Sequence, residues 1–253
     1  MTVHFVGAGP GAVDLITIRG RDLIAAADVI IQAGSLVNPQ LLELARPDCR
    51  LHDSATMTLD QIVAVMAAGQ AQGESVVRLH SGDPSLYGAI HEQMRRLDRL
   101  GIAYDICPGV SSLAGAAAAL KIEYTVPEAT QSVVITRLPG RTPTPPGETV
   151  AGFARHGSSL VLFLSTGRLA ELSAQLMAGG RAPDDPAAIV HKATWPGQER
   201  VIACTVADLA PAAAAAGVSA TALVVVGPCL TRSEAESRLY AADFATGLRP
   251  AQP

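Results

Sequence analysis

Residues 78–88 read RLHSGDPSLYG, and the rest of the chain is organised around this stretch. An apolar strand is predicted over residues 75–79, and a helical pattern begins near Ala89. The SGDP tetrapeptide (81–84) predicts a rigid loop, since glycine permits backbone conformations that other residues resist and proline restricts φ. Ligands of open α/β sheets bind at this carboxyl end of the strands. Because Gly-Asp-Pro is also common turn chemistry, the loop alone leaves a purely structural role open.

The composition predicts a globular chain and argues against nucleic-acid binding. With 253 residues, the chain has room for one large or two small domains. Hydrophobic residues make up 49% and aromatic residues only 4%, so alanine, valine and leucine must supply the core. A formal net charge of −4 argues against non-specific binding to nucleic acid, which requires a basic surface.

The cysteine pattern predicts a reducing, cytoplasmic compartment. Cys49, Cys107, Cys204 and Cys229 are too far apart in sequence to predict a metal-binding knuckle or a redox pair. Each lies in or beside an apolar run, where a buried reduced thiol is the ordinary interpretation. We also expect no secretory signal, because no basic segment followed by an apolar stretch is present at the start.

One uncharged segment, residues 209–230, is long enough to span a bilayer. It contains Pro211, Gly217 and Gly227, and much of it is alanine. We therefore predict a helix, a turn and a buried strand in this segment, and no membrane partner.

Strands alternate with helices at the start of the chain, which predicts a parallel sheet covered on both faces. The predicted strands cover residues 3–7, 29–32, 50–52, 75–79 and 103–107. A capping box of Thr58 and Gln61 predicts the start of one helix, and Gly101 predicts the end of the next.

Residues 121–130 are predicted to link an N-terminal α/β domain, residues 1–120, to a C-terminal α/β domain, residues 131–253, that ends in a polar tail. The predicted strands of the second domain cover residues 132–136, 160–164, 187–190, 201–205 and 222–226. The loop at 194–197 is too short for a parallel crossover, so the second sheet is predicted to be mixed. The predicted fold class is therefore α/β, with one parallel and one mixed sheet.

The segment GAGPGA (7–12) matches the residue types of the dinucleotide-binding fingerprint but not its structural context. In that fold the helix begins inside the glycines, so that its N-terminus meets the pyrophosphate. Here Pro10 and Gly11 delay the helix. Asp28, the acidic residue at the expected distance, precedes the second strand instead of following it. We therefore do not expect a nicotinamide cofactor.

Three further motifs lie at the ends of predicted strands. PGVSS (108–112) offers two hydroxyls and a helix N-terminus at the same sheet edge as the SGDP loop. LFLST (162–166) and VHKATWP (190–196) end strands of the second domain, and each of them taken alone is explained as plain core. Their common position at strand ends points to one ligand site.

Together these pieces resemble the tetrapyrrole methyltransferase superfamily, which uses S-adenosylmethionine. GxGPG and GDPxxYG are marks of the whole superfamily. AGSLVNP (33–39), HDSATMTL (52–59) and RLPGRTPTP (137–145) are similar to the branch that methylates carbon 11 of precorrin-4 in vitamin B12 biosynthesis. KATWP and TALVVVG extend the similarity through the second domain. Ser81 departs from the threonine or glycine common before Gly-Asp, and we expect it to be tolerated.

The resemblance implies a homodimer whose S-adenosylmethionine lies in a cleft between two α/β domains, held mostly by backbone groups and apolar walls. Leu164 and Ala193 would enclose the adenine from the second domain. Carried onto this sequence, the implied cofactor contacts are Pro10, Ser81, Gly82, Asp83, Leu86, Ser111, Ser112, Leu164 and Ala193.

Methyl transfer from a sulfonium requires no nucleophilic side chain, because the substrate's electron-rich carbon is the nucleophile. Positioning and desolvation can supply roughly 7–11 kcal/mol. No Ser-His-Asp, Cys-His or metal constellation is predicted. His80 and Asp83 are candidates to assist proton loss, with a packing or turn role as the alternative for His80. Arg137 and Arg141 are candidates to pair with substrate carboxylates, or else are solvated loop charges.

Other interpretations stay open at this point. The same motifs would serve the cobalt-bearing form of precorrin-4. A methyltransferase acting on a different corrin carbon, or diphthine synthase, would share the cofactor loops but lack AGSLVNP and HDSATMTL. A nicotinamide oxidoreductase would share only GAGPGA, and a non-enzymatic tetrapyrrole carrier would not need the cofactor loops. Binding of S-adenosylmethionine with turnover separates these classes.

Overall fold

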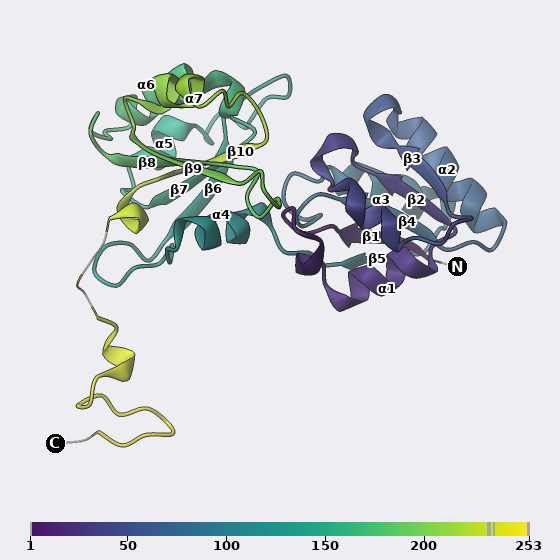
Figure 1. Ribbon diagram of the computed structural model, residues 1–253, viewed down its shortest axis with the longest axis horizontal. Helices are drawn as coiled ribbons and strands as arrows, with labels where there is room; N and C mark the ends of the chain where they lie inside the picture. The colour runs from purple at the N-terminus through teal and green to yellow at the C-terminus, as the bar shows by residue number, and fades with distance from the viewer. Residues whose placement is uncertain (1, 232–233, 235, 252–253) are drawn as a thin grey trace. The chain divides into compact units, whose positions relative to one another are not determined.

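The structure, a computed structural model, describes residues 2–231, 234 and 236–251 and shows two compact units (Figure 1). The first comprises the residues up to Ala119 together with His191–Arg200. The second comprises Leu120–Val190 and the residues from Val201 onward. The sequence assigns 191–200 to the second domain, whereas its contacts place this segment in the first unit.

The first unit contains a five-stranded parallel sheet with the strand order β3-β2-β4-β1-β5. The predicted parallel sheet is thereby confirmed. Its strands are β1 (Val3–Gly7), β2 (Val29–Gln32), β3 (Arg50–Asp53), β4 (Val76–His80) and β5 (Tyr104–Cys107). Strand β1 lies between β4 and β5, so the loops that follow these three strands leave the same edge of the sheet.

The helices of the first unit have the predicted end signals. Thr58 and Gln61 form the predicted capping box at the start of α2, and Gly101 adopts a left-handed conformation at the end of α3. The helices are α1 (Ile18–Ala26), α2 (Leu59–Ala71), α3 (Ile90–Leu100) and α4 (Ser112–Leu120). Short 3-10 helices cover Val13–Leu15, Gly34–Leu36, Pro39–Leu44 and Ser54–Thr56.

The core of the first unit lies on both faces of the sheet, because successive strand side chains point to opposite faces. One face carries Val6 and Leu79, which pack with Ile24 of α1. The other face carries Phe5, which packs with Met66 of α2 and Leu97 of α3. This double cover explains why the strands read as near-continuous apolar runs.

The second unit contains a five-stranded mixed sheet with the order β6-β7-β10-β8-β9, which confirms the predicted mixed character. Strand β6 is parallel to β7, and β10 is antiparallel to β7. The strands are β6 (Val133–Arg137), β7 (Ser159–Phe163), β8 (Pro186–His191), β9 (Arg200–Thr205) and β10 (Ala222–Val226). The helices α5 (Val150–Ala154), α6 (Leu169–Ala178) and α7 (Leu209–Ala215) pack on one face of this sheet.

Three short 3-10 helices complete the second unit as described: Thr166–Arg168, Pro228–Leu230 and Arg238–Tyr240. The uncharged segment 209–230 forms α7, a turn, β10 and one of these 3-10 helices, as its prolines and glycines predict. Among the described residues, every helix is too short or too polar to cross a membrane.

Candidate active site

The loops that follow β1 and β4 are joined by backbone hydrogen bonds at the carboxyl edge of the first sheet. Gly9 and Gly82 exchange two bonds, with N···O distances of 3.2 and 2.8 Å. The Ala8 N–H also donates to the His80 carbonyl at 2.7 Å. The structure therefore brings together the two loops that the sequence placed at one ligand site.

Three glycines allow the strand ends to approach one another backbone to backbone. A Cβ atom on Gly109 would lie 2.2 Å from the Gly82 carbonyl oxygen and 2.7 Å from the Gly7 Cα. A Cβ atom on Gly7 would lie 2.5 Å from the Gly109 Cα. No side chain fits at Gly7 or Gly109, and Gly82 favours glycine because its φ is +62°. We call Gly7, Gly82 and Gly109 the glycine cluster.

Asp83 connects the loop after β4 to the loop after β5. Its Oδ2 accepts the Gly109 N–H at 2.8 Å, and its Oδ1 accepts the Ser85 N–H at 2.8 Å and the Ser85 hydroxyl. Burial alone would raise the pKa of this carboxyl, but the hydrogen bonds from Ser85 and Gly109 outweigh it and hold the pKa below its usual range. Asp83 therefore carries a fixed negative charge at neutral pH.

The other predicted cofactor residues of the first unit lie around the same edge. Pro10 is buried, and Ser81 and Leu86 are half-buried in the loop after β4. Ser111 and Ser112 lie at the start of α4, where the Ser111 hydroxyl accepts the Leu113 N–H at 3.2 Å. A Cβ atom on Gly82 would lie 3.4 Å from the Ser112 nitrogen, so this helix start adjoins the SGDP loop.

Ala193 and Leu164 lie in different units. Ala193 is only 6% exposed and belongs to the first unit, where its Cβ lies 3.4 Å from the position that a Cβ on Gly115 would occupy. Leu164 belongs to the second unit, is 67% exposed and has φ of +50°. An exposed leucine with a left-handed backbone at a strand end is the kind of strained position found at ligand sites.

Asn38 holds the loop after β1, a role that the sequence did not indicate beyond its place in the AGSLVNP motif. Its side-chain N–H donates to the Gly11 carbonyl at 2.8 Å, and its side-chain oxygen caps the 3-10 helix at Gln40. It is 5% exposed. The signal that could have revealed it is the Asn-Pro pair, which is typical of a helix cap with proline at the first position.

His80 is unsuited to accept a proton. It is 4% exposed and lies beside Phe5, with ring centroids 6.2 Å apart, and its Nε2 has no hydrogen-bond partner among the described residues. Burial and the nearby Arg78 guanidinium lower the pKa of His80 to about 3. A neutral imidazole with so low a pKa is a weak base, and the packing role is the better supported of the two alternatives.

Replacing His80 with leucine should remove an acid sensitivity of the fold. Because the pKa of His80 is lower in the folded than in the unfolded protein, its stability contribution is complete above pH 6.5 and is lost as the pH falls towards 3. Between pH 7 and pH 5 the wild type should lose about 2 kcal/mol more of its free energy of unfolding than the variant. Urea unfolding at both pH values measures this. An equal loss in both proteins would show that His80 protonates freely.

The two candidate substrate arginines differ in their contacts. The Arg137 guanidinium donates to the carbonyls of Leu138, Thr142 and Pro143 and to the Thr142 hydroxyl, at 2.9–3.1 Å. It therefore holds the proline-rich loop that follows β6. Arg141, at the tip of the same loop, is exposed. Arg141 is the better placed of the two to meet a carboxylate from solution.

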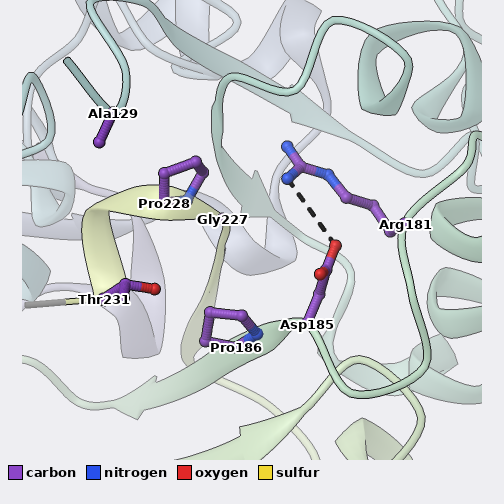
Figure 2. Close-up of a pocket in the computed structure, with 7 residues that line it drawn as sticks. All are labelled: Ala129, Arg181, Asp185, Pro186, Gly227, Pro228 and Thr231. Carbon is purple, nitrogen blue, oxygen red and sulfur yellow. Dashed lines mark ion pairs between the residues drawn. The ribbon is translucent and has the colours of Figure 1, made fainter.

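A pocket of about 370 Å³ lies in the second unit and is separate from these residues (Figure 2). It is lined by Ala129, Arg181, Asp185, Pro186, Gly227, Pro228 and Thr231. Gly227 follows β10 next to the start of β7, whereas Leu164 lies beyond the other end of β7. The pocket therefore lies at the sheet end opposite to Leu164, and none of the predicted site residues lines it.

The described residues contain no group of three or more histidine, cysteine, aspartate or glutamate side chains that could hold a metal ion. The four cysteines are free thiols. The polar groups that meet at the first sheet's edge are instead backbone amides, serine hydroxyls and the Asp83 carboxylate. Polar groups of these kinds are typical of sites that recognise an organic ligand by shape and hydrogen bonds.

The parallel sheet and the loops that meet at its carboxyl edge define an α/β protein, with the glycine cluster and the Asp83 carboxylate at the edge where ligands of such sheets bind. Residues 2–210 match the family model of the Tetrapyrrole (Corrin/Porphyrin) Methylases. The chain belongs to this family, and it is therefore a methyltransferase.

Individual members of the family that are similar to this chain include enzymes named for their tetrapyrrole substrates. The precorrin-4 C(11)-methyltransferase of Sinorhizobium sp is 48% identical over 242 residues, which cover 95% of each chain. The solved structure of a cobalt precorrin-4 methyltransferase, a cobalamin biosynthetic enzyme, matches with a TM-score of 0.88 at 39% identity, covering 91% of this chain and 96% of the other. The uroporphyrin-III C-methyltransferase of Thermus thermophilus, solved with S-adenosyl homocysteine, matches with a TM-score of 0.76 at 26% identity, covering 91% and 99%.

Proposed function

We propose that this protein transfers a methyl group from S-adenosylmethionine to carbon 11 of precorrin-4, giving precorrin-5 in vitamin B12 biosynthesis. The observation that carries the proposal is the 48% identity, over nearly the whole of both chains, to a relative with this name. The motifs AGSLVNP, HDSATMTL and RLPGRTPTP, which distinguish this branch from others of the family, support the choice of carbon.

The residues at the edge of the first sheet fit S-adenosylmethionine. The loops carry small residues, and the fixed charge of Asp83 suits a ligand that bears a sulfonium and an ammonium group. When bound, the cofactor supplies an activated methyl group. The residues proposed to hold it are Pro10, Ser81, Gly82, Asp83, Leu86, Ser111, Ser112 and Ala193, with Leu164 contributing from the second unit.

The chain's own contribution to the reaction is positioning and exclusion of water. The glycine cluster and the Asp83 bonds hold the loops after β1, β4 and β5 in one arrangement before any ligand binds. Preorganisation of this kind can supply roughly 7–11 kcal/mol of a barrier. Asp83 already accepts three hydrogen bonds, and His80 is a weak base, so the geometry favours a transfer that needs no protein base.

Alanine substitutions should separate the two arginines of the proline-rich loop. Arg141→Ala should raise the apparent KM for the tetrapyrrole by up to about fivefold, because an exposed ion pair contributes at most about 1 kcal/mol. Arg137→Ala should lower kcat as well, since the loop loses the donor to its own carbonyls. Steady-state kinetics measure both effects. Unchanged kinetics in Arg141→Ala would remove it from the substrate site.

Assembly and location are part of the proposal. A homodimer is supported by the family resemblance and by the abundant alanine and low charge of the chain, which allow a large apolar interface. A cytoplasmic location is supported by the four free thiols. Light scattering at micromolar concentration tests the first, and a monomer would contradict it.

The decisive experiment follows a labelled methyl group into the product. Purified protein is incubated with ¹³C-methyl S-adenosylmethionine and, in separate arms, with metal-free or cobalt-bearing precorrin-4, and the labelled carbon is located by NMR. A label at carbon 11 is expected, and the faster arm identifies the substrate form. A label on another carbon would show a different member of the family. Calorimetry without S-adenosylhomocysteine binding at millimolar ligand would overturn the proposed cofactor.

A further inference from the structure

The loop between β8 and β9, residues 192–199, contacts the glycine-rich loop after β1. The Thr194 Oγ1 accepts the Ala12 N–H at 3.1 Å, although the two residues are 182 positions apart in sequence. We propose that Thr194 is a positioning residue for the cofactor, fixing residues 9–12 in the shape that receives S-adenosylmethionine. This inference rests on the proposed function, because it concerns the same cofactor site.

Three separate elements hold residues 9–12. Gly9 is held by its two backbone bonds to Gly82. The Gly11 carbonyl is held by the Asn38 side chain, and the Ala12 amide by Thr194. Pro10, the predicted cofactor contact, lies buried between these points. Removing the Thr194 hydroxyl would therefore free one end of the loop while leaving the other two attachments intact.

Thr194 also lies beside α4, the helix that follows β5. Its methyl carbon lies 3.3 Å from the position that a Cβ on Gly115 of α4 would occupy. The neighbouring Trp195 packs against Gly11, where a Cβ would lie 2.2 Å from the indole Cδ1. Thr194 is thus next to both the loop after β1 and the helix after β5, which are two of the segments proposed to hold the cofactor.

The backbone of Thr194 is strained. Its φ is +66° and that of Lys192 is +47°, a region that β-branched residues rarely adopt. The turn is maintained by a bond from the Thr194 N–H to Glu199 Oε2 at 2.6 Å and one from the Trp195 N–H to the Lys192 carbonyl at 3.0 Å. Glycine would suit this backbone better, so a threonine here is explained by its side chain, and strain of this kind gathers at functional sites.

Glycine and serine variants separate positioning from stability. Thr194→Gly relieves the strained backbone and removes the hydroxyl. Its melting temperature should be no lower than that of the wild type, while its S-adenosylhomocysteine affinity by calorimetry should fall by about fivefold to tenfold. Thr194→Ser retains the hydroxyl and should bind within about twofold of the wild type, since the hydrogen bond survives. Glu128→Gly, at an exposed residue with φ of +60° in the second unit, is the matched control and should leave affinity unchanged.

Tryptophan fluorescence gives an independent readout, because Trp195 is the chain's one tryptophan. S-adenosylhomocysteine should change its emission in the wild type, and acrylamide should quench it more strongly in ligand-free Thr194→Gly. Wild-type affinity in Thr194→Gly would overturn the positioning role. So would weak binding in Thr194→Ser if the melting temperatures of Thr194→Gly and Thr194→Ser were both lowered. Either result would leave the proposed function standing. Absence of binding to the wild type would instead overturn the proposed function, and this inference with it.

Discussion

Gly109→Ala should abolish S-adenosylhomocysteine binding and destabilise the first unit by at least about 3 kcal/mol, the upper end of what overpacking usually costs. The added methyl group would lie 2.2 Å from the Gly82 carbonyl oxygen and 2.7 Å from the Gly7 Cα. These are backbone atoms of neighbouring strand ends, so no side-chain rotation can relieve the contact. Either the loop after β5 moves away, breaking its bond to Asp83, or the sheet edge opens.

Gly140→Ala is the matched control, since a Cβ there has no neighbour within 4 Å. It should bind the ligand with wild-type affinity and keep the melting temperature within a few degrees. Calorimetry and thermal unfolding of both variants check the contrast. If Gly109→Ala folds and binds like Gly140→Ala, the glycine cluster does not shape the site, and the loops owe their arrangement to Asp83 alone.

Much of this arrangement was predictable because parallel sheets obey strong rules. Alternating strands and helices predict a covered parallel sheet, and the carboxyl ends of its strands must share one edge. The loops with Gly9, Gly82 and Ser111 could therefore be placed together from sequence alone. The short connection at 194–197 likewise predicted a mixed second sheet, because a parallel crossover needs more residues.

What the sequence could not show are the individual side-chain contacts between segments far apart in the chain. Nothing local to Thr194 indicates that its hydroxyl meets Ala12, and sequence order places residues 191–200 with the second domain. Side chains of the same type also cannot be told apart by pattern. Arg137 and Arg141 look equivalent in RLPGRTPTP, yet the first is engaged by its own loop and the second is exposed.

Asp83→Asn should weaken S-adenosylhomocysteine binding by at least tenfold and lower the free energy of unfolding by about 1–3 kcal/mol. In the sequence, this carboxylate is identified only as an implied cofactor contact and a candidate to assist proton loss. The structure adds a structural role, because Oδ2 accepts the Gly109 amide while Oδ1 accepts two donors from Ser85. The NH2 group that replaces one carboxylate oxygen in asparagine cannot accept a hydrogen bond, so the contacts of that oxygen must be lost, together with the charge.

The pH dependence of the same variant separates the charge from the shape. Because hydrogen bonds hold the pKa of Asp83 lower in the folded than in the unfolded protein, its stabilising effect is present above pH 3.8 and is lost as the pH falls through the folded pKa. The difference in unfolding free energy between wild type and Asp83→Asn should therefore be largest near neutral pH and shrink below pH 3.8. Ser85→Ala, which removes one hydroxyl donor and keeps the charge, should lose less stability and retain most of the affinity. Two results together would contradict a role for the charge: a difference in unfolding free energy between wild type and Asp83→Asn that is the same at every pH, and binding by Ser85→Ala that is as weak as binding by Asp83→Asn. They would mean that the shape of the loop matters and the charge of the carboxylate does not.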